Sequence, residues 1–84
     1  MDADKLIESR NAQLGDPVVT HREIARVWSK YLGIVITAEQ VAEMMALMKD
    51  VRVVRNLAAG ADPTDSFDDA EAYRRIAQLC REAQ

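Results

Sequence analysis

Carboxylate side chains gather at two places in this sequence where helix geometry could turn them into metal ligands. Glu39 and Glu43 are four residues apart, so they share one face of a helix, while Asp65 and Asp68 are three apart in a later segment. Magnesium prefers hard oxygen ligands, and two helices that each carry acidic residues can hold it together with a phosphate substrate. The sequence therefore raises the hypothesis of a magnesium site built from these four residues.

The same carboxylates carry a resemblance to a known enzyme family. Residues 39–43 read Glu-Gln-Val-Ala-Glu and residues 65–68 read Asp-Ser-Phe-Asp. These segments resemble the Glu-Glu-x-x-Glu and Glu-x-x-Asp motifs of the MazG-like all-α nucleotide pyrophosphohydrolases. Gln40 replaces one ligand, and Asp65 replaces a glutamate with a shorter side chain. The resemblance implies a Mg²⁺-dependent nucleotide hydrolase, complete or decayed, in which the four carboxylates hold the metal.

The expected arrangement of the two helices argues against this site within one chain. If the chain turns back around Asp62, residues equidistant from the turn face each other, so Glu43 lies opposite Arg81. The two acidic pairs are then separated by roughly 15–20 Å along the hairpin, at 1.5 Å per helical residue. Only a partner subunit could bring them together.

The same register predicts two further charge pairs across the hairpin. Asp50 is expected near Arg74, and Asp69 near Arg55. Exposed pairs of this kind contribute only about 0–1 kcal/mol each. Together with helix capping by acidic residues, they explain the carboxylates without a metal.

The single cysteine and the single histidine exclude other kinds of site. Cys80 has no partner for a disulfide within the chain, and its apolar neighbours predict a buried thiol, with a reactive cysteine as the alternative. His21 is remote in sequence from Cys80. Neither a Cys-His or Ser-His-Asp arrangement nor the usual zinc patterns are expected.

Four helical segments, separated by turns that contain glycine or proline, are expected to position these residues. They span about residues 3–14, 20–32, 38–59 and from about residue 66 nearly to Gln84. The sequence thus predicts a single all-α domain over residues 1–84. We expect a small bundle of about four helices, in which a long central helix forms an antiparallel hairpin with the C-terminal helix.

The expected helix ends and the core follow from residue types. Capping boxes are predicted at residues 20–23 and 37–40, and Gly33 is predicted to end the second helix. Asp65 or Ser66 is expected to cap the last helix. Residues 34–36, Ile-Val-Ile, are predicted to form a buried connector, because a strand would have no second strand to pair with. The predicted core face of the last helix consists of Phe67, Ala70, Tyr73, Ile76, Ala77 and Cys80.

The long central helix carries a broad apolar face that is rich in methionine. This face includes Met44, Met45 and Met48, with Val51 and Leu57 further along. Methionine serves both as core packing and at adaptable binding surfaces, so the two interpretations stay open. At about 22 residues the helix is roughly 33 Å long, which is more than a small domain covers by itself. We therefore expect a homo-oligomer, with a dimer favoured.

The charge and hydropathy of the chain limit the kinds of partner and the cellular location that we expect for it. The net charge is −3 and the isoelectric point is about 5.0, which argues against nucleic acid as a partner. A weaker nucleic-acid hypothesis rests on the cluster of Lys49, Arg52 and Arg55. No apolar run reaches the ~18 residues of a membrane helix, and the acidic N-terminus lacks a signal-peptide pattern. A cytoplasmic protein is expected.

A second resemblance covers roughly residues 9–77. It rests on Lys49 with Arg52 near the end of the long helix, and on Asp65, Asp69 and Tyr73 in the last helix. It also includes Ser9-Arg10, Leu14-Gly15-Asp16-Pro17, residues 24–33 and residues 36–45. This pattern resembles a family of small proteins of unknown function from tailed phages and prophages, in which glycine is usual at the position of Ala72.

The second resemblance implies a phage or prophage gene whose product acts in the host cytoplasm. Its mixed-charge cluster could bind a phosphate-bearing ligand or lock the hairpin. We predict a non-enzymatic oligomeric protein that binds itself and a host or phage protein, without a cofactor; Mg²⁺ belongs to the enzymatic alternative alone. The residues predicted to form interfaces are Met44, Met45, Met48, Lys49, Arg52 and Tyr73.

Overall fold

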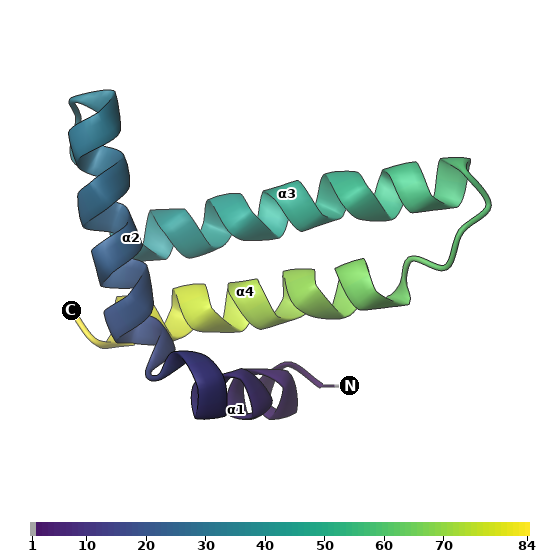
Figure 1. Ribbon diagram of the computed structural model, residues 1–84, viewed down its shortest axis with the longest axis horizontal. Helices are drawn as coiled ribbons and strands as arrows, with labels where there is room; N and C mark the ends of the chain where they lie inside the picture. The colour runs from purple at the N-terminus through teal and green to yellow at the C-terminus, as the bar shows by residue number, and fades with distance from the viewer. Residues whose placement is uncertain (1) are drawn as a thin grey trace.

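The computed structural model describes residues 2–84, and within them the chain is all-α, as predicted. Its helices are α1 (Ala3–Leu14), α2 (Pro17–Leu32), α3 (Ala38–Ala58) and α4 (Thr64–Glu82). Figure 1 shows α3 and α4 side by side as an antiparallel hairpin, which is the most extensive helix pair. Helix α1 packs along α4, and α2 crosses the hairpin at the end where α3 begins (Figure 1).

Helix α2 begins three residues earlier than the predicted capping box. Asp16 caps it by accepting a hydrogen bond from the amide of Val18 at 2.9 Å. Pro17 fits the first position of the helix because no hydrogen-bond acceptor is needed there for its nitrogen. Thr20 therefore lies inside the helix, where its hydroxyl donates to the carbonyls of Leu14 and Asp16. The capping box predicted at residues 20–23 was wrong.

The predicted start of α3 is confirmed. The hydroxyl of Thr37 accepts from the amide of Gln40 at 3.1 Å, and the Gln40 side chain accepts from the amide of Thr37 at 2.9 Å. Gly33 ends α2 in the left-handed conformation with φ of 74°, also as predicted.

The start of α4 differs from the prediction. Asp62 accepts hydrogen bonds from the hydroxyl and the amide of Thr64, at 2.6 and 3.0 Å, and these bonds lower the pKa of its carboxyl group. Helix α4 thus begins at Thr64, and the caps predicted at Asp65 and Ser66 were wrong. Ser66 is buried instead.

The core consists of two clusters with many small residues. The first joins α1, α3 and α4 through Ile7, Ala42, Ala72, Ile76, Ala77 and Cys80. The second joins α2, α3 and the connector between them through Ala25, Ile36 and Val41, with Ile24, Trp28 and Met45 packed against it. Alanine dominates the contact between α3 and α4, so their backbones can approach closely.

Two predictions about buried residues were wrong. Phe67 is 55% exposed, because the buried face of α4 is centred on Ser66, Ala70 and Ala77, and Phe67 lies one helical step to the side. In the connector only Ile36 is buried, while Val35 is 89% exposed. Ile36 is fixed in its buried position by a hydrogen bond in which its amide donates to the Ser29 hydroxyl at 2.8 Å.

The close approach of α3 and α4 gives the first testable prediction. Ala42 has no exposed surface, so Ala42→Leu should overpack the core and lower the free energy of unfolding by about 1–3 kcal/mol. Thermal unfolding followed by circular dichroism should show a fall in Tm of about 4–8 °C per kcal/mol. Ala12→Leu, at an exposed position of α1, is the matched control and should leave Tm nearly unchanged. Equal effects of the two substitutions would contradict the close approach.

Candidate functional site

Ion pairs along one edge of the hairpin confirm two of the predicted pairs. Arg81 lies 2.6 Å from Glu39 and 3.6 Å from Glu43, and the hydrogen bond to Glu39 raises the pKa of its guanidinium. Arg74 contacts Asp50, as the register predicted. The two acidic residues at the start of α3 thus face an arginine near the end of α4.

The structure does not bring the four predicted magnesium ligands together in one chain. Glu39 and Glu43 lie at Arg81, whereas Asp65 and Asp68 lie in the first two turns of α4, about 20 Å away at 1.5 Å per residue. Among residues 2–84, no three His, Cys, Asp or Glu side chains are grouped so that they could hold a metal ion. A site made from both pairs requires a second chain.

Asp69 forms the centre of an ionic cluster that joins three helices. Its carboxylate accepts from the Arg10 guanidinium of α1 at 2.8 Å and lies 3.0 Å from the Lys49 ammonium of α3. The side chains of Lys49 and Asp69 are only 17% and 16% exposed. The predicted pair of Asp69 with Arg55 was wrong, because Arg55 is exposed while Lys49 points toward α4.

Several residues that carried the second resemblance meet at this cluster. Arg10, Lys49 and Asp69 are in direct contact, although they come from distant parts of the sequence. Arg52 and Asp65 are exposed, and neither makes an ion pair within residues 2–84. The contacts therefore favour a cluster that fastens α1 and α3 to α4.

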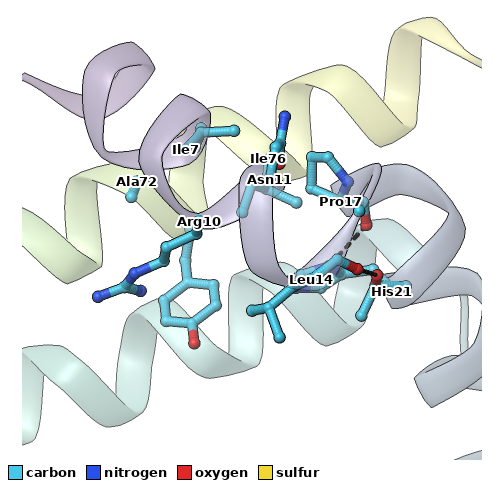
Figure 2. Close-up of a pocket in the computed structure, with 11 residues that line it drawn as sticks. Ile7, Arg10, Asn11, Leu14, Pro17, His21, Ala72 and Ile76 are labelled. Atoms are coloured by element: carbon cyan, nitrogen blue, oxygen red, sulfur yellow. Dashed lines mark hydrogen bonds between the residues drawn. The ribbon is translucent and has the colours of Figure 1, made fainter.

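A cavity of about 80 Å³ lies between α1, the turn to α2, and α4 (Figure 2). Its walls include Ile7 and Ile76, and Arg10 and Leu14 line it as well. His21 lies in its wall with 6% of its surface exposed. Its ring contacts the ring of Tyr73 edge-on, with 6.1 Å between the centroids.

Sequence reasoning missed both Arg10 and His21 as functional candidates. His21 was placed in a capping turn, whereas the earlier start of α2 puts it one turn inside the helix. A usable signal was present in the sequence. His21 stands four residues after Pro17 and four before Ala25, which is the spacing of the buried face of α2.

The methionine face divides between the core and the surface. Met45 packs against the cluster of Val41 and Ile36, whereas Met44 and Met48 are 45% and 39% exposed. Exposed apolar residues of α3 form what we term the α3 outer face, namely Met44, Leu47, Met48, Val51 and Val54. Leu47 lies at its edge and also lines a groove with residues of α4. Of the other residues predicted to form interfaces, Lys49 belongs to the ionic cluster and Tyr73 lines the cavity.

Cys80 is buried, as predicted, and its burial raises the pKa of the thiol. A thiol of this kind is a weak nucleophile because little thiolate is present at neutral pH. As for membranes, none of the helices described is both long enough and apolar enough to span one.

The burial of the ionic cluster gives a second testable prediction. Asp69→Asn should lower the free energy of unfolding by about 1–2 kcal/mol, because two cations lose a charged acceptor in a poorly hydrated place. Asp50→Asn is the matched control. It loses the Arg74 pair, whose side chains are 41–45% exposed, and should cost less than about 1 kcal/mol. Urea unfolding of the two variants tests this difference, and equal losses would argue against a special role for Asp69.

Comparison with known proteins identifies the family of the chain. A search of the curated proteins found no match, and neither did a search of the solved structures. A family model, that of a domain of unknown function named DUF6378, matches residues 1–81. This match covers nearly the whole chain and includes all four helices almost completely. The chain therefore belongs to the DUF6378 family.

Proposed function

We propose that this chain is a non-enzymatic helical protein that assembles into a homo-oligomer, first a dimer, through the α3 outer face and acts by binding other proteins. The observation that carries this proposal is the exposure of apolar side chains along α3. Leu47, Val51 and Val54 are each 62–64% exposed, although they are large and apolar. Contiguous surfaces of this kind on small proteins commonly mark interfaces.

The spacing of the apolar residues suits a helix partner. Met44, Leu47, Val51, Val54 and Ala58 follow one another at intervals of three, four, three and four residues. This is the a/d pattern of a coiled-coil seam, in which a second helix packs at a shallow crossing angle. The seam lies on the side of α3 opposite to buried Ala42 and Ala46, so α4 does not cover it.

The size of the apolar surface is sufficient for a stable pair. The exposed fractions of the α3 outer face correspond to roughly 500 Å² of accessible surface per protomer. Leu32, Ile34 and Val35 adjoin it, since they line one shallow groove together with Met44 and Leu47. With them the surface reaches about 900 Å² per protomer, close to the ~800 Å² per partner of a standard interface.

The charges beside the α3 outer face also permit self-association. Glu43 and Asp50 flank it, and a symmetric pair could bring these acidic groups close to those of the second copy. Arg81 and Arg74 of the same chain already neutralise them. The repulsion between two identical faces is therefore reduced without any group from the partner.

The biological setting of the proposal comes from the second resemblance. It favours a phage or prophage gene, whose product would act in the host cytoplasm. The pairing of α3 would leave α1, and the exposed Val19 and Val27 of α2, available for a host or phage protein. The proposal that the protein is not an enzyme is supported by the ion pairs that Arg81 forms with Glu39 and Glu43.

The dimer gives a third testable prediction. Leu47→Glu combined with Val54→Glu should raise the dimer Kd at least about 100-fold, because burial of four unpaired carboxylates would oppose association. Light scattering and sedimentation equilibrium between about 1 and 100 µM measure the change. The control combines Val19→Glu with Phe67→Glu, which are 51% and 55% exposed and lie on α2 and α4. A wild-type chain that is monomeric throughout this range would refute the proposal.

The absence of catalysis is tested separately. With Mg²⁺ or Mn²⁺ and a panel of nucleoside triphosphates, we expect no release of pyrophosphate above the rate without protein. Glu43→Gln is the matched variant, since Glu43 is the more exposed partner of Arg81 and its loss should not unfold the chain. Pyrophosphate release by the wild-type protein that disappears in Glu43→Gln would favour the MazG-like alternative.

A further inference from the structure

The His21 ring presents a hydrogen-bond acceptor to the cavity between α1, α2 and α4. Its Nδ1 lies 2.8 Å from the carbonyl oxygen of Pro17, which can only accept, so Nδ1 carries the proton and donates. In the neutral ring Nε2 is then an acceptor. Within residues 2–84 Nε2 makes no hydrogen bond, yet no side-chain nitrogen or oxygen there is both sealed from solvent and unsatisfied. His21 is 94% buried and lines this cavity, and from this we infer that Nε2 meets solvent at the cavity.

Most of the remaining wall is apolar and sized for the edge of a ring, although Asn11, Thr20 and Tyr73 also line the cavity. Ile7, Ala72 and Ile76 are all buried and line it. The cavity volume of about 80 Å³ is roughly half of the ~150 Å³ of a closed cavity that holds benzene. A flat ring can therefore enter by one edge, while its other edge stays at the mouth.

The mouth of the cavity offers a cation. The Arg10 side chain is 43% exposed, and one of its nitrogens is engaged by Asp69, which leaves further N–H donors free to meet a ligand. Leu14, 67% exposed, also lines the cavity, and in Figure 2 Arg10 and His21 lie on opposite sides of the view. Guanidinium groups bind carboxylates well because two N–H donors match two oxygens.

We propose that this cavity binds a small planar ring that carries a hydroxyl at one end and a carboxylate at the other. The hydroxyl enters first and donates to Nε2 of His21. The ring packs between Ile7 and Ile76, and the carboxylate accepts from Arg10 at the mouth. The cavity does not involve the α3 outer face, so this proposal stands independently of the proposed dimer.

The experiment compares three related probes on the wild-type protein. Titrations followed by ¹H–¹⁵N correlation spectra use 4-hydroxybenzoate, 4-fluorobenzoate and phenol at up to about 10 mM, the range of weak ligands. We expect 4-hydroxybenzoate to shift the amide signals of cavity residues and, in long-range ¹H–¹⁵N spectra of the imidazole ring, the Nε2 signal of His21. It should bind about 10-fold more tightly than 4-fluorobenzoate, which lacks the donor, and than phenol, which lacks the carboxylate.

Two variants test the assigned contacts. Arg10→Gln should lower the affinity for 4-hydroxybenzoate about 10-fold and leave the affinity for phenol unchanged. Arg26→Gln, which replaces an exposed arginine of α2, should change neither affinity. His21→Phe should remove the preference for 4-hydroxybenzoate over 4-fluorobenzoate. No shift of cavity signals by any probe would overturn the proposal, and so would equal affinity of the wild-type protein for 4-hydroxybenzoate and 4-fluorobenzoate. The wild-type comparison decides the matter even where a variant fails to fold.

Discussion

The contact between α3 and α4 is the constraint on which the rest of the structure depends. Ala42 and Ala46 of α3 lie near Ala77 of α4, and Ala70 is buried nearer the turn; each of the four is at least 97% buried. Small side chains let the two backbones approach, so long charged side chains can reach across the edges of the hairpin. The same residues remove little apolar surface from water, because alanine contributes far less than leucine or isoleucine. The hairpin therefore needs additional contacts to be stable.

Those contacts come from the ionic cluster and from α1. Asp69 fastens α1 and α3 to α4 at a single point, with distances of 2.8 and 3.0 Å to its two cations. Helix α1 then covers Ile76 and Cys80, which would otherwise be exposed on α4. Where α1 turns into α2 the packing is incomplete, and the cavity that remains is lined by His21 of α2 and by the small Ala72 of α4.

Local signals in the sequence were sufficient for the fold and for part of the site. The capping box of Thr37 and Gln40 and the left-handed Gly33 depend on neighbouring residues alone, and both were predicted correctly. The register of the hairpin follows from the length of its turn, which is why Glu43 was correctly placed at Arg81. Burial of Cys80 followed from helical periodicity.

The errors arose where contacts between helices decide the outcome. Distance from the turn placed Arg55 at the level of Asp69, but Arg55 is exposed, and the long side chain of Lys49, six residues earlier in α3, reaches Asp69 instead. Capping was misjudged at the starts of α2 and α4, because Asp16 caps α2 ahead of Thr20, and Asp62 accepts from Thr64 just before Asp65. The role of Arg10 could not be derived from its own helix, since its partner Asp69 lies 59 residues away.

The hairpin register also explains why surface, and not carboxylate chemistry, carries the proposed function. Pairing Glu39 and Glu43 with Arg81 places them at the opposite end of α4 from Asp65, so the two acidic groups do not share one site within the chain. The same pairing neutralises the acidic groups on one flank of α3. The apolar residues of the α3 outer face remain exposed. A chain of 84 residues with an alanine-rich core gains more from covering that surface than from a further surface ion pair. Association through α3 would supply the apolar burial that the alanine contact between α3 and α4 cannot provide.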